Sequence, residues 1–245
     1  MIKASVKVLL TGKKLVRMPH GCTDPEKLRF HWHKKRWVVP IERWLFRHAE
    51  RIVATCEDEV NWIKAFEPKV KKVDVVPLSP QSVYRAVSYA PCVDFEAPKT
   101  AKLLYVGRLH PLKGVEFLFE AVPPDCKLVV IGKDEGEGRK LKKIAARRGL
   151  DVEFSGVVSE EAKNAAYDWC DALVLPTLSE NFGLVIAEAL ERGKRVITTD
   201  GAPAWGDGND YGGRLVYLKG YRDGTSEERV RLLKNAIEEL ACHQS

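Results

Sequence analysis

The sequence predicts an α/β fold whose larger part is a doubly wound parallel sheet. From residue 100 onward, short apolar runs alternate with stretches of helical apolar spacing, which is the pattern of a parallel sheet with helices on both faces. The strands are expected near residues 102–107, 127–132, 152–155, 171–176, 195–199 and 213–217. The helices are expected near residues 113–121, 137–148, 159–168, 183–192 and 226–242.

A smaller α/β unit is expected before that sheet. Its strands are expected near residues 6–10, 15–18, 51–55 and 73–77, and its helices over residues 25–48, with a break at Pro40, and 57–66. Residues 80–99 mix proline, serine and other polar residues without clear periodicity, which is typical of an interdomain connection. We therefore expect an N-terminal domain over residues 1–79, a linker over 80–99 and a C-terminal domain over 100–245.

Composition limits the classes of protein to consider. Of the 245 residues, 45% are hydrophobic and 30% are charged, and no apolar run approaches the roughly 18 residues of a membrane span. The six cysteines lie far apart without a C-x-x-C pair, which favours reduced thiols in a cytoplasmic setting. No signal peptide is evident, and the motifs of P-loop and dinucleotide-binding proteins are absent from the sequence.

Two carboxylates mark the stretch of residues 175–190, which runs from a buried strand through a polar turn into a helix. A ligand at the carboxyl end of this strand would face the N-terminus of that helix, whose free N–H groups and dipole favour an anion such as a diphosphate. Glu180 lies in the turn, and Glu188 lies on the helix, where it is able to accept hydrogen bonds from ribose hydroxyls. The alternative is that both are ordinary charged residues on a solvated surface.

A second candidate group follows the strand expected at residues 102–107. Arg108 and Lys113 flank a turn that contains proline and precedes an amphipathic helix. In a doubly wound sheet, ligands bind at the carboxyl ends of strands near the point where the strand order reverses, so these cations and Glu180 are expected to converge. An Arg fork and a Lys point charge suit a pyrophosphate leaving group. The alternative is a solvated turn with two surface cations.

Together these segments resemble the retaining nucleotide-sugar glycosyltransferases of family 4, the group 1 glycosyltransferases of the GT-B class. The resemblance covers nearly all of residues 100–218 in the expected order and spacing. It is carried by GRLHPLKG (107–114), KLVVIGKDEGEG (127–138), VEFSGVVSEE (152–161), DALVLPTLSENFGLVIAEAL (171–190) and KRVITTDGAPAW (194–205). It implies a complete C-terminal Rossmann-like domain in a GT-B-like fold.

The resemblance also implies roles for individual residues. Arg108 and Lys113 would bind the donor diphosphate, Glu188 the ribose, and Glu180 the transferred sugar. Lys133 and Asp134 would line the nucleotide pocket, with the loop of residues 156–158 beside the base. The expected catalytic residues are Glu180, Arg108, Lys113 and His20. The expected donor-binding residues are Gly107, Lys133, Val157, Asn181, Phe182, Gly183, Leu184 and Glu188.

The implied reaction moves a sugar from a UDP- or GDP-sugar to an acceptor hydroxyl with retention at the anomeric carbon. The nucleotide sugar is a co-substrate, and the resemblance implies neither a cofactor nor a metal ion. The segment TTDGAPAW (198–205) replaces the Gly-Gly-Pro-Glu pattern of many relatives and is similar to enzymes that build lipopolysaccharide or capsular sugars. The expected acceptor is a glycan or a lipid-linked acceptor.

The N-terminal part departs from the family pattern. Relatives have two Rossmann-like domains of similar size, whereas fewer than 100 residues precede the nucleotide-binding half here. We therefore expect a truncated N-terminal acceptor-side domain without its early strands and its glycine-rich loop. Residues 17–30 resemble the late part of that domain, where His20 would end a strand facing the donor. The alternative for His20 is a structural role in the turn before Gly21.

Two functions remain open at this point. The first is the transferase itself. The second is a nucleotide-sugar-binding module that is inactive alone, either a gene remnant or one half of a two-chain enzyme whose partner chain supplies the missing N-terminal elements. Residues 75–80 (VVPLSP) also replace the Asn-Gly pair with which many relatives enter the linker.

Positive charge is concentrated in residues 31–37 (HWHKKRW), within a chain of formal net charge +6. No nucleic-acid recognition motif accompanies this stretch, so we expect no nucleic-acid partner. Aromatic and basic residues on a helix suit the surface of a membrane, which would place the protein peripherally on the inner face of the cell membrane. The alternative is a helix that packs its apolar side on the core. His31 and His33 have no third ligand nearby, so no metal site is expected.

Overall fold

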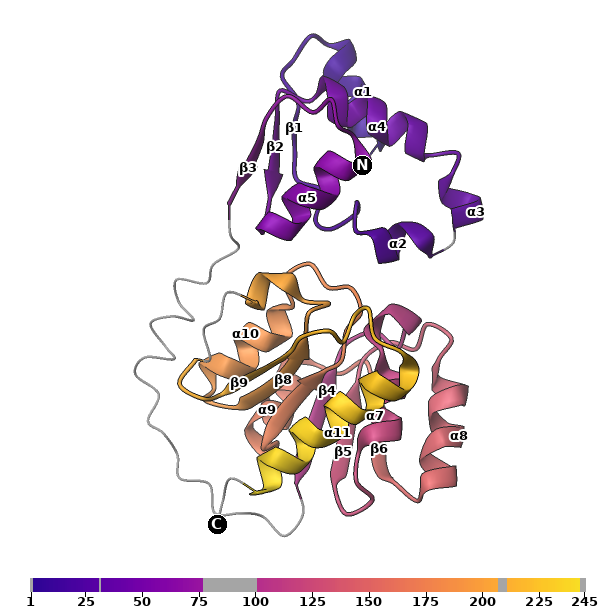
Figure 1. Cartoon of the computed structure of the whole chain (residues 1–245), viewed down its shortest axis with the longest axis vertical. Helices are drawn as coiled ribbons and strands as arrows, with labels where there is room; N and C mark the ends of the chain where they lie inside the picture. Colours follow the sequence, from indigo (N-terminus) through magenta and orange to yellow (C-terminus); the bar gives the residue numbers. More distant parts are fainter. Residues whose placement is uncertain (1, 31, 77–100, 207–210, 243–245) are drawn as a thin grey trace. The chain divides into compact units, whose positions relative to one another are not determined.

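The computed structural model describes residues 2–30, 32–76, 101–206 and 211–242. The chain divides into two compact units, Met1–Leu78 and Ser79–Ser245, which are described separately below. Figure 1 shows the elements of each unit. The linker expected over residues 80–99 lies outside the described residues.

A six-stranded parallel sheet forms the centre of the C-terminal unit, in the order β6-β5-β4-β7-β8-β9. The strands are β4 (Lys102–Val106), β5 (Lys127–Ile131), β6 (Asp151–Gly156), β7 (Ala172–Leu175), β8 (Arg195–Thr199) and β9 (Leu215–Leu218). The chain therefore builds the sheet outward from β4 to one edge and then returns to β7 and continues to the other edge. This is the doubly wound order, and its switch point lies between β4 and β7. The predicted fold class is confirmed.

Helices cover both faces of this sheet (Figure 1). Helix α7 packs between α8 and α11 on one face, and α9 and α10 lie on the other, as right-handed crossovers require. Their bounds are α7 (Val115–Ala121), α8 (Gly138–Arg148), α9 (Glu160–Trp169), α10 (Leu184–Glu191) and α11 (Ser226–Cys242), with short 3-10 turns η1 (Pro111–Lys113) and η2 (Pro203–Trp205). Strands β4, β7 and β8 are buried along most of their length, which explains why their sequences are continuous apolar runs.

The N-terminal unit contains a three-stranded parallel sheet in the order β1-β2-β3. Its elements are α1 (Ile2–Leu10), β1 (Val16–Arg17), α2 (Pro25–Arg29), α3 (Trp32–Lys35), α4 (Val39–His48), β2 (Arg51–Ala54), α5 (Glu57–Phe66) and β3 (Val73–Val75). Leu45, Phe46, Ile52 and Ile63 are almost completely buried and form the centre of its core. The predicted helix over residues 57–66 is confirmed, and β2 agrees with its prediction to within one residue.

Two predictions for this unit were wrong. The strand expected at residues 6–10 is the second half of helix α1, in which Ile2, Val6 and Leu9 recur at helical spacing and Leu9 packs against the core. Pro40 does not break a helix but lies in the first turn of α4, where its missing N–H costs no helical hydrogen bond. The expected long helix is instead divided into α2, α3 and α4.

Candidate functional site

The switch point of the C-terminal unit brings two loops into close contact, one after β4 and one after β7. The N–H of Leu178 donates to the carbonyl of Leu112 at 2.9 Å, and the Thr177 hydroxyl donates to the same oxygen at 3.2 Å. Gly114 has a φ of 61°, and a Cβ at this position would overlap the carbonyl oxygen of Pro176. Glycine is therefore required here both for its conformation and for the close approach of the two loops.

A third loop, after β8, fixes the backbone of the turn that carries Glu180. The N–H of Glu180 donates to the carbonyl of Gly201 at 2.7 Å, and the hydroxyl of Thr199 donates to the carbonyl of Thr177. A Cβ on Gly201 would overlap this same Thr177 carbonyl, so the two loops pack backbone against backbone. Glu180 is thus held from two neighbouring strands.

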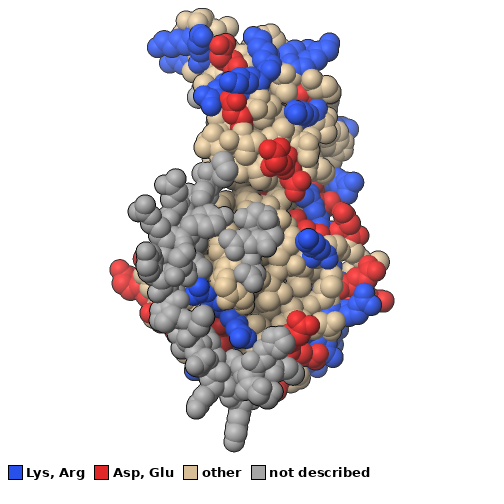
Figure 2. Space-filling model, turned by 60° about the vertical axis from the view of Figure 1, so that its left-hand side comes forward, with Lys and Arg blue, Asp and Glu red and all other residues tan. Residues whose placement is uncertain are grey.

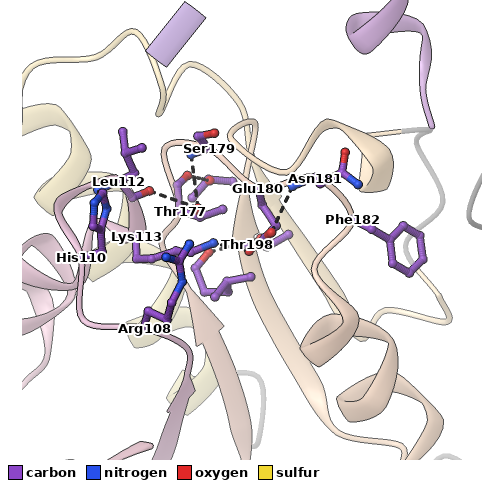
Figure 3. A network of polar contacts seen from close by, with 12 residues as sticks. Arg108, His110, Leu112, Lys113, Thr177, Ser179, Glu180, Asn181, Phe182 and Thr198 are labelled. Atoms are coloured by element: carbon purple, nitrogen blue, oxygen red, sulfur yellow. Dashed lines mark hydrogen bonds and ion pairs between the residues drawn. The ribbon is translucent and has the colours of Figure 1, made fainter. Parts of the chain in front are cut away.

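Lys113 and Glu180 form an ion pair across the switch point (Figure 3). Lys113 is only 8% exposed, and its Nζ donates to Glu180 Oε2. The other carboxylate oxygen, Oε1, accepts from the backbone N–H of Asn181 at 3.0 Å. The structure therefore brings together two of the residues that the sequence placed at neighbouring strand ends, and it presents a largely buried cation beside the start of α10.

Arg108 lies on the same loop as Lys113 and is held in place by its backbone. Its carbonyl accepts from the Tyr105 hydroxyl at 2.9 Å, and burial raises the pKa of Tyr105 far above its ordinary value, so this hydroxyl keeps its proton. A side chain on Gly107 would meet the Tyr105 hydroxyl at 2.8 Å, which explains the glycine. The Arg108 guanidinium is exposed and pairs with Glu135 Oε2 at 2.9 Å.

A cavity of about 300 Å³ lies at the carboxyl ends of β5 and β6. Lys133 and Val157 both line it, as do Leu109, Gly132, Phe154 and Asp134. Asp134 Oδ1 accepts from the N–H groups of Gly138 and Gly136 at 3.0 and 2.9 Å, and these bonds lower its pKa. Asp134 therefore caps the start of α8 while it borders the cavity. The structure brings together the residues that were expected to line the nucleotide pocket.

Glu188 of α10 is held by two residues of α9. Lys163 Nζ lies 3.1 Å from Oε1 and 3.0 Å from Oε2, and the Tyr167 hydroxyl donates to Oε2 at 2.8 Å. Burial and the neighbouring Glu188 raise the pKa of Tyr167 well above its ordinary value, so its hydroxyl remains a donor. Partial burial disfavours the charged form of Lys163, but bonds to Glu188 and Glu160 outweigh this and raise its pKa.

The turn before α10 contains the remaining expected donor-binding residues. Gly183 begins the helix with a φ of 74°, and Leu184 is exposed. The ring of Phe182 is directed away from the Lys113–Glu180 pair and packs against Trp205, with ring centroids 5.3 Å apart (Figure 3). Trp205 Nε1 also donates to the Phe182 carbonyl. Both the ring and the carbonyl of Phe182 therefore contact Trp205 and anchor the turn.

His20 lies in the N-terminal unit and adopts a left-handed conformation with a φ of 49°. The N–H of the following Gly21 donates to Oε1 of Glu59, a carboxylate that is completely buried. Glu59 Oε2 accepts from the N–H and the hydroxyl of Thr55, each at 2.7 Å. A buried carboxylate thus fixes the turn of His20, whose role at the donor remains a prediction.

Sequence reasoning did not identify Glu135, Lys163 or Tyr167. Each contacts an expected site residue that lies 21 to 27 positions away in the sequence. The one local indication was that Lys163 and Tyr167 are four positions apart on an expected helix and therefore share a face. Within the described parts of the chain, no group of three or more His, Cys, Asp and Glu residues is placed to hold a metal ion.

Comparison with known proteins identifies the C-terminal segment. Residues 94–207 match the family model described as glycosyl transferases group 1. This segment belongs to the group 1 glycosyltransferase family. Within the chain, 112 residues are 32% identical to a phosphatidyl-myo-inositol mannosyltransferase of Mycobacterium tuberculosis, a match covering 42% of this chain and 29% of that protein. A glycogen synthase of the same organism is 27% identical over 175 residues, or 67% of this chain and 41% of the synthase.

Solved structures extend the similarity beyond this segment, at the level of fold. Anabaena Alr3699/HepE, solved in complex with UDP and glucose, matches 100% of this chain and 70% of its own, with a TM-score of 0.67 and 20% identity. WaaG, a glycosyltransferase involved in lipopolysaccharide biosynthesis, matches 94% of this chain and 68% of its own, with a TM-score of 0.68 and 17% identity. The chain spans less than half of the curated relatives that it matches.

Proposed function

We propose that this chain transfers a sugar from a UDP- or GDP-sugar to an acceptor hydroxyl with retention at the anomeric carbon. The observation that carries the proposal is the arrangement at the switch point, where Lys113 pairs with Glu180 shortly before α10 begins and the exposed Arg108 lies on the same loop as Lys113. Two cations and a helix N-terminus together suit a diphosphate. The similar fold of HepE, which was solved with UDP and glucose, supports a nucleotide-sugar donor.

In the proposed mechanism, the acceptor hydroxyl attacks the anomeric carbon from the side on which the diphosphate leaves. The bond from the anomeric carbon to the phosphate oxygen breaks as the new glycosidic bond forms, and a leaving phosphate oxygen takes the acceptor proton. Arg108 and Lys113, rather than a metal ion, neutralise the charge that develops on the diphosphate. Such electrostatic stabilisation of a leaving group provides much of the rate enhancement in reactions of this type.

Binding of the donor nucleoside is divided between two places in this proposal. The base occupies the cavity lined by Lys133 and Val157, and the ribose hydroxyls donate to the carboxylate of Glu188. Glu188 is suited to this because Lys163 and Tyr167 hold it in one orientation, with one Oε1 contact and two Oε2 contacts. A carboxylate fixed in this way loses little freedom when it accepts hydrogen bonds from a ligand.

Replacing Tyr167 with phenylalanine is expected to reduce the preference for ribose over its 2′,3′-dideoxy form. The change removes only the hydroxyl that orients Glu188. Binding of UDP or GDP should therefore weaken about fivefold, which corresponds to the loss of one hydrogen bond. Binding of the dideoxy nucleotide should change little, because it lacks the hydroxyls that Glu188 would bind. Titration calorimetry with both nucleotides measures the difference. Equal weakening of both ligands would contradict the proposed contact between Glu188 and ribose.

Tyr221→Phe is the matched control for this change. Tyr221 is also completely buried in the C-terminal unit, and its hydroxyl has no hydrogen-bond partner within the described residues. Loss of this hydroxyl should therefore leave the preference for ribose as it is in the original protein.

A membrane surface is the proposed location of the acceptor. Trp32, Trp37 and Trp44 of the N-terminal unit are 52%, 72% and 40% exposed, and Arg36 stacks on Trp37 with its guanidinium carbon 5.0 Å from the ring centroid. Figure 2 shows many Lys and Arg side chains on the visible face of this unit. Aromatic and basic side chains together suit an anionic lipid surface on the cytoplasmic side and a lipid-linked acceptor of cell-surface polysaccharide or lipopolysaccharide. No helix in the described ranges is long and apolar enough to cross a membrane.

Sedimentation with lipid vesicles tests this location. Vesicles that contain anionic lipid should bind the protein, and Trp37→Ser should weaken this binding several-fold because a large exposed aromatic ring is lost. Equal binding to neutral vesicles, or no effect of the substitution, would contradict the proposed surface.

Titration with a panel of nucleotides tests the proposed function as a whole. UDP or GDP should bind, the matching nucleotide sugar should be slowly hydrolysed in the absence of an acceptor, and the sugar first released should keep the anomeric configuration of the donor. Binding without hydrolysis or transfer would instead favour a nucleotide-sugar-binding module. If none of the nucleotides binds, the proposed function is wrong.

A further inference from the structure

We propose that Glu135 competes with the donor diphosphate for Arg108 and thereby sets the affinity of the site for diphosphates. The inference rests on the proposed function, because it assigns Arg108 to the diphosphate. Its starting point is that the guanidinium Nη1 of Arg108 donates to Glu135 Oε2 at 2.9 Å. An incoming diphosphate must therefore replace or share this carboxylate.

Backbone hydrogen bonds hold Glu135 at this position. The loop after β5 is joined to the loop after β4 by the N–H of Leu109, which donates to the Lys133 carbonyl at 2.8 Å. In return, the N–H of Glu135 donates to the Leu109 carbonyl at 3.1 Å, and Leu109 and Asp134 form a parallel β-bridge. The backbone of Glu135 is thus bonded to the residue that follows Arg108, so the pairing of the two loops holds the ion pair in place.

The charges of these four side chains balance in pairs. Arg108 is paired with Glu135 and Lys113 with Glu180, so two cations face two carboxylates. The two pairs differ in exposure, since the side chain of Arg108 is 60% exposed and that of Lys113 is 11% exposed. Exchange of one anion for another is easiest at the exposed pair, where water replaces the broken contacts at little cost.

This competition has a consequence for turnover. After transfer, the nucleoside diphosphate carries one more ionisable phosphate oxygen than the donor, and its charge binds Arg108 more strongly. A carboxylate that returns to Arg108 lowers the affinity for this product and favours its release. Glu135 therefore sets how tightly the nucleoside diphosphate is bound and how readily it is released, without contacting the reacting atoms.

Glu135→Gln is the variant that tests the inference. Amide and carboxylate have nearly the same shape, but the neutral amide does not compete with the diphosphate by charge. UDP or GDP should therefore bind about threefold to fivefold more tightly, which corresponds to the free energy that one exposed ion pair contributes. Titration calorimetry with UDP, GDP and inorganic pyrophosphate measures this at low and at high salt. The gain should shrink at high salt because the competing charge is screened.

Glu137→Gln is the matched control, since it removes the same charge two positions further along the chain. Glu137 Oε2 lies 3.9 Å from Lys140 Nζ, and within the described residues Glu137 makes no ion pair with Arg108. It should change the affinity for UDP or GDP by less than about twofold, because it does not pair with Arg108. An equal gain in both variants would show a general effect of net charge and would overturn the proposal.

The effect must also depend on Arg108. In an Arg108→Ala background, Glu135→Gln should no longer tighten binding, because there is no cation left to compete for. A gain that persists without Arg108, or weaker binding in the single variant, would overturn the proposal. If pyrophosphate responds as expected but no nucleotide binds, the proposed function fails and the role of Glu135 stands. If nothing binds to the original protein, both are wrong.

Discussion

Replacing Lys113 with alanine is expected to lower donor turnover by a factor of about 100 to 1,000, the usual cost of removing one group that stabilises developing charge in an active site. Lys113 is largely buried beside the start of α10, and it pairs with Glu180 across the switch point. A buried cation acts on the leaving diphosphate with little screening by water. The rate of release of nucleoside diphosphate from the nucleotide sugar measures the effect.

Stability should change much less than turnover in this variant. Glu180 keeps its bond from the N–H of Asn181 and remains partly exposed, so loss of its partner should lower the free energy of unfolding by about 1 to 3 kcal/mol. Lys127→Ala is the control, because Lys127 begins β5 at the opposite end of the sheet. Unchanged donor turnover in Lys113→Ala would count against the assignment of the site.

Gly114→Ala is expected to lower the free energy of unfolding by about 2 to 5 kcal/mol. A left-handed conformation costs an L-residue about 1 to 2 kcal/mol, and forcing extra atoms into a packed site costs about 1 to 3 kcal/mol more. Gly114 has a φ of 61°, and the new Cβ would overlap the backbone of Pro176. The loops after β4 and β7 must then separate, so nucleotide binding should weaken as well.

Gly149→Ala separates these two costs. Gly149 has a φ of 64° at the end of α8, but a Cβ there would meet no atom within 4 Å. Only the conformational cost applies, so this variant should lose about 1 to 2 kcal/mol and bind nucleotides normally. Denaturant unfolding of both variants gives the comparison. Equal losses would show that the close approach at Gly114 does not matter to the fold.

The sheet of the C-terminal unit could be predicted from sequence because its signals are local. Strands such as β4 and β7 are buried on both sides and therefore appear as continuous apolar runs, while Gly149 ends helix α8 in the left-handed conformation that favours glycine. The order of strands and helices alone was enough to predict the switch point. That prediction correctly placed Lys113 close to Glu180, although the roles of both residues remain predictions.

The contacts that surround these residues could not be predicted in the same way. Glu135 reaches Arg108 only because two loops pair through their backbones, and Tyr167 reaches Glu188 only because α9 and α10 pack side by side. Neither arrangement leaves a pattern in the local sequence. The wrong strand at residues 6–10 has a related cause, since a short apolar run does not by itself distinguish a strand from part of a helix.

Amide chemical-shift mapping of the full chain with UDP and GDP locates the bound diphosphate. Saturation with the nucleotide that binds is expected to shift the amides of residues 108–110, 112–114 and 180–184 most strongly, followed by those lining the cavity near Lys133 and Val157. In Lys113→Ala these shifts should require far more nucleotide. Strong shifts confined to other parts of the sheet, with residues 108–114 and 180–184 unchanged, would contradict a diphosphate site at the switch point.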